Sequence, residues 1–230
     1  MFNTIGIITK PKDFTSEETA RELSVFLHEQ GVSLVEDSEQ ISKNADLIIV
    51  VGGDGSILNT ARTYVDRNIP ILGVNLGRLG FLADVSVENM IAVVEQILNG
   101  DFIKEERALL SCQIERGNQI LSKHLAFNDA VIHRNNTPRM IEFELFVDGA
   151  FVNNQRADGM IITTPTGSTA YALSSGGPIM HPSVKSICLV SISPHTMSHR
   201  PIIVHGESEI VIRLLDSYEN ATASFDGQAK

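Results

Sequence analysis

The sequence predicts two domains of different fold class, an α/β domain with a parallel sheet followed by a β-rich domain. In residues 1–100, short β-branched apolar runs alternate with amphipathic helical patterns, which is typical of parallel strands joined by helices. After Gly100 the strand patterns follow one another directly, separated by turns such as Arg116-Gly117-Asn118 and Val147-Asp148-Gly149. A domain boundary is therefore expected near residue 100, with domains at 1–100 and 101–230.

Local signals define the elements of the first domain. Ser16 is expected to cap the first helix, because Glu17 and Glu18 then lie in its positive first turn, and Gly31 ends it. Single helices between strands indicate a parallel sheet that is covered on both faces. The expected elements are strands at Thr4–Thr9, Val32–Val35, Asp46–Val51 and Ile69–Val74, and helices from Ser16 to Gly31, at Ile57–Val65 and at Glu88–Leu98.

The second domain is expected to contain many strands and one short helix, which lies at Ser168–Ser175. No internal repeat or low-complexity segment interrupts the pattern. The expected strands are Leu109–Glu115, Gln119–Arg134, Ile141–Val147, Phe151–Arg156, Ser186–Ser191, Glu209–Leu215 and Thr222–Phe225.

Composition and charge exclude several classes of partner. The net charge of −10 argues against a nucleic acid or a membrane surface held by bulk electrostatics. Cys112 and Cys188 show no metal-ligand spacing and are expected to be reduced thiols. No apolar run approaches the ~20 residues of a membrane helix. The short N-terminal apolar segment is followed at once by charged residues, so it is no signal peptide. A cytoplasmic protein is expected.

The segment Gly52-Gly53-Asp54-Gly55 lies between a buried strand pattern and a helix pattern. Glycines there let a ligand approach the backbone, and a helix N-terminus offers free N–H groups to a phosphate. A carboxylate ~4 Å from a phosphate would cost about 4 kcal/mol at an effective dielectric of ~20. That cost is tolerated if a cation lies between them, or if Asp54 accepts a proton from an attacking hydroxyl. The motif therefore predicts phosphoryl transfer, although it is neither a P-loop nor a dinucleotide fingerprint.

A second polar segment runs from Asp158 to Pro178 and is rich in hydroxyls and glycines. Its hydroxyls around a helix start suit the oxygens of ribose and phosphate, and they exceed the one hydroxyl that a helix cap needs. A hydrolase nucleophile at Ser168 is the weaker alternative, because the Gly-x-Ser-x-Gly pattern is absent. This segment is predicted to bind a nucleotide.

Several smaller features leave two interpretations open. Asn128-Asp129 either binds a ribose diol or forms a turn. The glycine-rich stretch that ends at Phe81 either covers the Asp54 turn or connects two elements with Phe81 in the core. Arg139 and Arg156 are isolated basic residues, which are more often solvated surface charges than residues that bind phosphate. A histidine metal site among His181, His195, His199 and His205 is disfavoured. His195 and His199 lie between Pro194 and Pro201, which argues against a helical ligand pair, and no Cys or acidic ligand motif accompanies them.

Taken together, these residues resemble the NAD kinases, which phosphorylate the 2′-hydroxyl of the adenosine ribose of NAD to make NADP. The Thr-Pro-Thr-Gly-Ser-Thr-Ala-Tyr run is the most specific marker, whereas lipid kinases and phosphofructokinase-type enzymes share the glycine-aspartate turn. The resemblance covers nearly the whole chain. Its markers are Gly52-Gly53-Asp54-Gly55, Asn75 to Leu82, Asn128-Asp129, Asp158 to Pro178, Pro194-His195, Arg200-Pro201 and Asp226-Gly227-Gln228.

The resemblance implies roles for these residues. Asp54 would be the proton acceptor for the 2′-hydroxyl, while the glycine turn and Mg²⁺ or another divalent cation orient the phosphates of ATP or polyphosphate. It implies a Rossmann-like first domain and a β-sandwich-like second domain that binds the dinucleotide and forms a homodimer or homotetramer. The implied binding residues are Gly52, Gly53, Gly55, Phe81, Asn128, Asp129, Arg139, Arg156, Asp158, Thr169, Ala170, Tyr171, Ala172, Leu173, Ser174 and Gln228.

Two departures from the family pattern keep other hypotheses open. The family usually has Asn-Glu where this chain has Asn128-Asp129, which shortens the reach of the carboxylate, so that its hydrogen bond is expected either to differ or to pass through water. The chain also ends two residues after Gln228, where relatives usually continue. The alternatives are a lipid or sugar kinase with the same glycine-aspartate turn, and a non-catalytic NAD(P)-binding module.

Overall fold

The chain folds into two units, Met1–Glu105 and Glu106–Lys230. The computed structural model describes residues 2–77, 82–83, 85–135, 139–196, 199–215 and 221–229. Within these ranges, no helix is long and apolar enough to cross a membrane.

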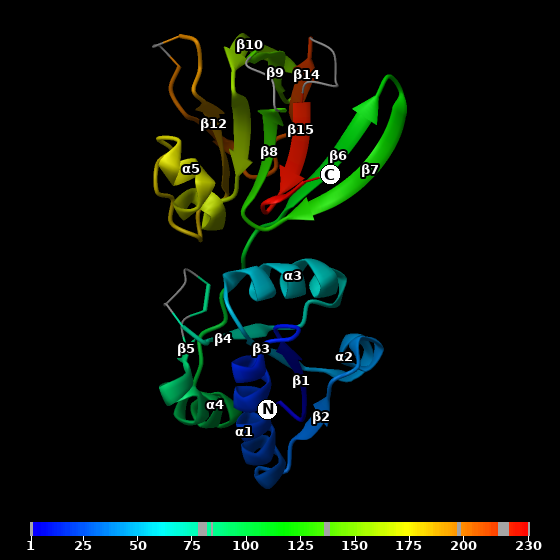
Figure 1. Ribbon diagram of the computed structural model, residues 1–230, viewed down its shortest axis with the longest axis vertical. Helices are drawn as coiled ribbons and strands as arrows, with labels where there is room; N and C mark the ends of the chain where they lie inside the picture. The colour runs from blue at the N-terminus through cyan, green and yellow to red at the C-terminus, as the bar shows by residue number, and fades with distance from the viewer. Residues whose placement is uncertain are drawn as a thin grey trace. The chain divides into compact units, whose positions relative to one another are not determined.

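The first unit is built on a five-stranded parallel sheet with the order β2-β1-β3-β4-β5. The central strand β3 is buried at every position, which explains its uninterrupted apolar sequence. Figure 1 shows this sheet with its helices. The predicted parallel-sheet α/β class is confirmed. The strands are β1 (Thr4–Thr9), β2 (Ser33–Val35), β3 (Leu47–Val51), β4 (Ile71–Asn75) and β5 (Val85–Ser86).

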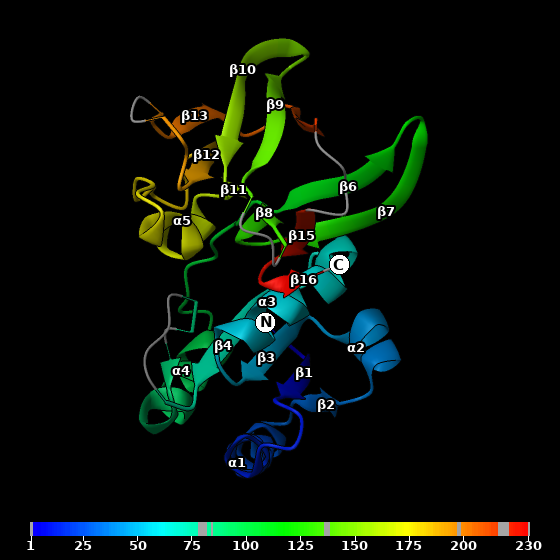
Figure 2. The ribbon, with the colours of Figure 1, turned by 45° about the horizontal axis from the view of Figure 1, so that its top comes forward.

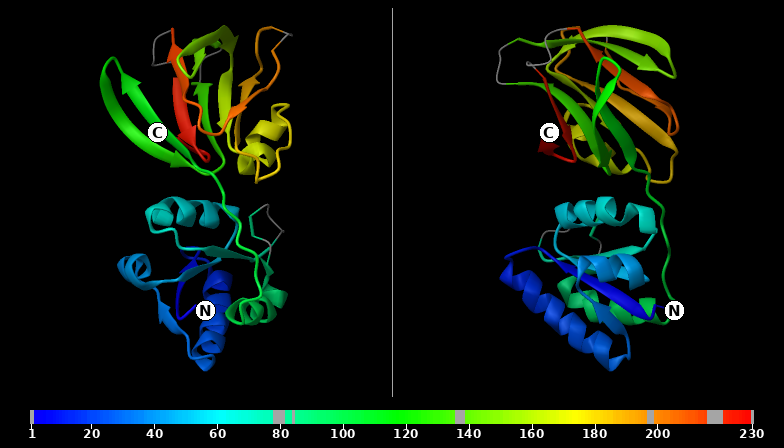
Figure 3. Two further views of the ribbon diagram at one scale, coloured as in Figure 1. Left: turned by 180° about the vertical axis from the view of Figure 1, so that it is seen from behind. Right: turned by 90° about the vertical axis from the view of Figure 1, so that its right-hand side faces the viewer.

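Helices cover both faces of this sheet, as Figure 3 shows. Successive residues of β3 point to opposite faces, so Ile49 packs in one apolar cluster and Ile48 in the other. Helices α1 (Phe14–Glu29) and α4 (Met90–Leu98) pack in the Ile49 cluster, and α2 (Ser38–Asn44) and α3 (Asp54–Tyr64) in the Ile48 cluster. Single 3₁₀ turns at Val65–Arg67 and Val87–Asn89 adjoin α3 and α4.

The expected start of the first helix was wrong. The helix begins at Phe14, and its N-cap is Asp13, whose carboxylate accepts the N–H of Ser16 at 3.1 Å. Ser16 is fully buried, and its hydroxyl donates to the Val51 carbonyl at 2.6 Å. Both residue types can cap a helix, but the hydroxyl of Ser16 is used to tie α1 to the end of β3. Helix α2 was not expected, because Ile41 is its only buried residue.

The second unit is β-rich, as predicted. A six-stranded antiparallel sheet has the order β13-β12-β11-β8-β15-β16, and a three-stranded sheet has the order β10-β9-β14. Figure 2 shows β6 and β7 as a long curved hairpin beside them. The strands are β6 (Leu110–Arg116), β7 (Gln119–Ala126), β8 (Asp129–Arg134), β9 (Ile141–Val147), β10 (Ala150–Ala157), β11 (Gly159–Thr163), β12 (Ser186–Ile192), β13 (Ile202–His205), β14 (Ile210–Leu214), β15 (Ala221–Phe225) and β16 (Gln228–Ala229).

Three differences from the expected elements matter for the site. The single strand expected at Gln119–Arg134 is interrupted between β7 and β8. The helix expected at Ser168–Ser175 is a 3₁₀ turn, Thr166–Thr169, followed by the four-residue helix α5 (Tyr171–Ser174). Strands β11, β13 and β16 were not expected from the sequence pattern.

The six-stranded sheet has two different faces. Ala130 of β8 belongs to the core that this sheet shares with β9, β10 and β14. Its neighbour Val131 belongs to a smaller cluster on the opposite face, together with Ala172 of α5. Alternate residues of β8 therefore reach the face that α5 covers in part, and the cavity described next opens on that face.

Candidate active site

The glycine turn and Asp54 lie at the junction of β3 and α3. Asp54 is the first residue of α3, Gly53 is its N-cap with φ −96°, and the Asp54 carboxylate accepts the N–H of Leu82 at 3.2 Å. This bond brings Leu82 next to the first turn of α3. Residues 78–81, which include Phe81, lie outside the described residues, so the two interpretations of Phe81 stay open.

The three glycines of the turn have different reasons to be small. None of them has a positive φ. A Cβ on Gly52 would lie 2.7 Å from the Ser56 hydroxyl, so that glycine is needed for packing. A Cβ on Gly53 or Gly55 would meet no atom within 4 Å. Neither backbone conformation nor packing among the described residues explains Gly53 and Gly55, and they leave open space at the first turn of α3.

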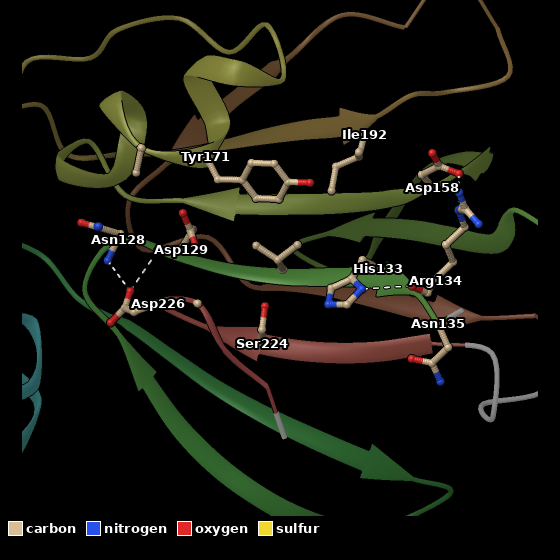
Figure 4. A pocket seen from close by; sticks show the side chains of 13 residues that line it. Asn128, Asp129, His133, Arg134, Asn135, Asp158, Tyr171, Ile192, Ser224 and Asp226 are labelled. Atoms are coloured by element: carbon tan, nitrogen blue, oxygen red, sulfur yellow. Dashed lines mark hydrogen bonds and ion pairs between the residues drawn. The ribbon is translucent and has the colours of Figure 1, made fainter. Parts of the chain in front are cut away.

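The second unit contains a cavity of about 690 Å³ on the α5 side of the six-stranded sheet, shown in Figure 4. This volume is within the usual range for small-molecule sites. Five of the predicted binding residues line it: Asn128, Asp129, Asp158, Ala170 and Tyr171. The other lining residues are Val131, His133, Arg134, Asn135, Ile192, Ser224, Asp226 and Gly227.

The backbone at one end of the cavity is fixed by Asp226. Its carboxylate accepts the N–H groups of Phe127, Asn128 and Asp129 at 3.0, 2.7 and 3.2 Å. In return, its own N–H donates to the Asp129 carbonyl at 3.0 Å. Three consecutive donors on one carboxylate hold the segment between β7 and β8 in a single conformation.

The Thr163–Tyr171 run holds the same segment from its other side. The hydroxyls of Thr163 and Thr164 donate to the carbonyls of Asn128 and Phe127 at 3.0 and 2.7 Å. A Cβ on Gly167 would lie 2.5 Å from the carbonyl carbon of Asn128, so only glycine lets the two backbones approach this closely. The buried hydroxyls of this run thus bind the chain itself. The interpretation that they serve mainly as ligand donors was wrong for Thr163 and Thr164.

Asp129 carries an acidic side chain into the cavity with only 5% of the residue exposed. Among the described residues its carboxylate has no hydrogen bond or ion pair. Burial, and then the nearby charge of Asp226, raise the pKa of Asp129 to about 6. The residue as a whole is buried, but its carboxylate opens on the cavity, where it can receive hydroxyl donors from a ligand.

Asp129→Asn is expected to stabilise the protein at pH 7. The folded-state pKa of about 6 lies above the ordinary value of 3.8. The stabilising contribution of protonated Asp129 is therefore complete below about pH 4, declines as the pH rises and is lost above about pH 6. Ionisation of Asp129 in the folded protein therefore lowers the free energy of unfolding at pH 7 by as much as about 3 kcal/mol. Asp129→Asn has no group to ionise there and avoids this loss.

Urea denaturation of both proteins at pH 4, 5, 6 and 7 measures this effect. Asp101→Asn, at an exposed position, is the matched control for the loss of one carboxylate. A difference between Asp129→Asn and the native protein that stays constant from pH 4 to pH 7 would contradict the expectation.

The remaining predicted binding residues do not line this cavity. Arg139 and Arg156 are exposed, as are Leu173, Ser174 and Gln228. Ala172 is fully buried in the cluster beneath α5, and the hydroxyl of Thr169 donates to the Thr166 carbonyl at 3.4 Å. Their roles stay predictions.

The sequence interpretation missed Val131 and His133 of β8 and Asn135 directly after it. Together with Asp129 they are spaced by two, so they lie in one row on one face of this segment. That spacing was visible in the sequence once β8 was recognised. At the far end of the row, Arg134 and Asp158 form an ion pair at 2.6 Å, and the Thr222 hydroxyl donates to Asn135. Within the described ranges, no group of three His, Cys, Asp or Glu residues is placed to hold a metal ion.

Comparison with known proteins gives one consistent result. Residues 34–102 match the model of the ATP-NAD kinase N-terminal domain, and residues 127–230 match that of the ATP-NAD kinase C-terminal domain. An NAD kinase of Hydrogenovibrio crunogenus is 47% identical over 248 residues, covering 99% of this chain and 85% of the relative. An NAD kinase of Teredinibacter turnerae is 43% identical over 246 residues, covering 100% and 84%.

Solved structures agree with these sequence matches. Yeast NADH kinase complexed with NADH superposes with a TM-score of 0.89 at 27% identity, covering 99% of this chain and 74% of that one. An NAD kinase from Archaeoglobus fulgidus in complex with ATP gives a TM-score of 0.78 at 27% identity, covering 98% and 84%.

Proposed function

Because this chain belongs to the NAD kinase family, we propose that it transfers the terminal phosphoryl group of ATP to the 2′-hydroxyl of the adenosine ribose of NAD. Relatives named NAD kinase, one of them 47% identical, and matches to both family domains make it an NAD kinase enzyme. The observation that carries the detailed proposal is the position of Asp54, a carboxylate at the first turn of α3 beside glycines that packing does not require.

The phosphates of ATP are proposed to bind at the N-terminus of α3. The N-terminus of a helix favours anions, and the open space at Gly53 and Gly55 lets them come close. The solved relative named as a complex with ATP supports a donor of this kind.

A divalent cation such as Mg²⁺ is compatible with the residues present. Magnesium sites of kinases commonly use one or two carboxylates and complete their coordination with substrate phosphates and water. Asp54 supplies one carboxylate, and the described residues offer no set of three protein ligands, which fits a cation held largely by ATP. When bound, the cation neutralises charge on the phosphates.

The dinucleotide is proposed to bind in the cavity of the second unit. Asn128 and Asp129 lie at one end of it, in a segment that Asp226 and the Thr163–Tyr171 run hold in place. The Asp129 carboxylate accepts hydrogen bonds from ribose hydroxyls, and Tyr171 and Ile192 provide contact surface for the rings. The relative described as complexed with NADH supports a nicotinamide dinucleotide as ligand.

Asp54 is proposed to act as the general base. Its carboxylate takes the proton of the 2′-hydroxyl as the oxygen attacks the terminal phosphorus of ATP. The bond from that phosphorus to the bridging oxygen breaks, and ADP leaves. General base catalysis contributes roughly 10²- to 10⁴-fold, and the rest of the rate comes from orientation and charge stabilisation.

Formation of NADP is the direct test of this function. The protein is incubated with NAD and Mg²⁺ and with ATP, GTP or polyphosphate, and NADP is measured with an NADP-specific dehydrogenase. NADP is expected with ATP, and none when EDTA is added in excess of the cation. NAD binding by calorimetry without any NADP would favour a non-catalytic binding module, and phosphorylation of diacylglycerol without that of NAD would favour a lipid kinase.

Two further expectations stay proposals. The family resemblance implies a homodimer or homotetramer formed through the second unit. The exposed apolar side chains of Phe151 and Ile203 on its strands are compatible with such contacts. A cytoplasmic location is the other expectation.

A further inference from the structure

His133 lies near the end of the cavity opposite to Asp129, on the same face of β8 (Figure 4). Its neighbour on β11 is Gly159, which has no side chain, and a Cβ there would lie 3.0 Å from the Cα of His133. Its neighbour on β15 is Thr222, whose hydroxyl is bound to Asn135. The imidazole is half-buried and lines the cavity, and no side chain of β11 covers it on the Gly159 side.

One ring nitrogen of His133 is committed to the backbone. Nδ1 lies 3.0 Å from the carbonyl oxygen of Arg134. A carbonyl oxygen can only accept, so Nδ1 must carry the hydrogen of this bond. In the neutral imidazole, Nε2 is then a hydrogen-bond acceptor.

Nε2 has no partner among the residues that the structure describes. Other polar groups at this end of the cavity are engaged, because Asp158 pairs with Arg134 at 2.6 Å and Asn135 accepts the hydroxyl of Thr222. The imidazole thus offers the cavity an acceptor whose orientation is fixed by the bond on its other side.

We propose that His133 is a specificity-determining contact of the dinucleotide pocket, where its Nε2 accepts a hydrogen bond from an N–H or O–H group of the bound dinucleotide. This inference rests on the proposed function, because it takes the cavity to be the dinucleotide site. The contact is made by the ligand's outer groups and not by the reacting hydroxyl. It therefore strengthens binding and leaves the chemical step unchanged.

Two amide substitutions separate this role from a structural one. In His133→Gln, the amide oxygen reaches the position of Nε2 and can still accept from the ligand. In His133→Asn, the shorter amide reaches the position of Nδ1, where it can donate to the Arg134 carbonyl but presents nothing to the cavity. A ligand contact predicts that Gln preserves affinity and Asn loses it, whereas a purely structural role predicts the opposite order.

The Kd for NAD is measured by calorimetry at pH 8, where imidazoles are neutral in general, and kcat and KM are measured with ATP. His133→Asn and His133→Ala are expected to raise Kd and KM about fivefold to tenfold with kcat nearly unchanged. His133→Gln is expected to stay within about twofold to threefold of the native protein, since it keeps a neutral acceptor. Unchanged Kd in His133→Ala, or better binding by Asn than by Gln, would overturn the proposal.

A measurement on the native protein covers the case in which short side chains at position 133 unfold the domain. The ¹⁵N spectrum of labelled histidine, with the His133 signals identified by their loss in His133→Gln, should show the Nδ1–H tautomer and a shift of Nε2 on addition of NAD. An unmoved Nε2 signal at saturating NAD would refute the contact. Failure of the native protein to make NADP is a separate result, which refutes the kinase proposal and leaves the NAD affinities to decide the role of His133.

Discussion

Asp54→Asn is expected to bind NAD with nearly native affinity and to form NADP at least about a hundredfold more slowly. Asparagine has the same shape, and its amide oxygen can still accept the N–H of Leu82, so the first turn of α3 should keep its conformation. It cannot take a proton from a hydroxyl at neutral pH. The loss should therefore fall on kcat and spare the affinity for NAD.

Three measurements test this expectation: kcat from NADP formation, the Kd for NAD from calorimetry, and the melting temperature. Asp66→Asn is the matched control, because Asp66 is exposed in the 3₁₀ turn that follows α3. It should leave all three quantities unchanged. Near-native kcat in Asp54→Asn would remove Asp54 from the role of general base.

Gly167→Ala is expected to destabilise the second unit and to weaken NAD binding strongly. The new methyl group would lie 2.5 Å from the carbonyl carbon and 2.6 Å from the Cα of Asn128, which are backbone atoms that cannot rotate away. Overpacking of this kind costs typically about 1–3 kcal/mol. The backbone shift that relieves the clash moves Asn128 and Asp129, so the cavity proposed for the dinucleotide changes as well.

Gly55→Ala is a control that should affect activity without lowering stability. A Cβ there meets no atom within 4 Å, and Gly55 lies in the first turn of α3, where alanine is a better helix former by up to about 1 kcal/mol. This variant should unfold at the same or higher urea concentration and should lose activity, because the methyl group occupies the space proposed for phosphate. Equal urea midpoints for Gly167→Ala and the native protein would contradict the explanation of the Gly167 packing.

The sequence was sufficient for the parallel sheet of the first unit, because the uninterrupted apolar run of β3 and the helices around it carry strong local signals. The sequence was insufficient where a single long-range contact determines which residue caps a helix. Asp13 and Ser16 are both capping residues, and only the bond of Ser16 to β3 selects Asp13 as the cap. Helix α2 escaped notice because one buried residue gives no periodic pattern.

In the candidate site, too, local motifs were predictable from the sequence and long-range contacts were not. Motifs pointed to Asn128, Asp129 and Asp158, all of which line the cavity. Alternation along β8 contained the information for His133, but the expected strand ran through the break that precedes β8. The contacts of Asp226 depend on residues 97 to 99 positions earlier, and no local pattern in the sequence reports such a contact.

The long separation between Asp226 and the segment that it holds has a consequence for synthesis. A nascent chain that already contains Asn128 and the Thr163–Tyr171 run still lacks the carboxylate that gathers three consecutive amides at the cavity wall. Contacts of such high contact order form late and slowly. The affinity proposed for the dinucleotide should therefore emerge abruptly when the β15–β16 turn joins the sheet, so that translation products shorter than this turn should not bind the cofactor.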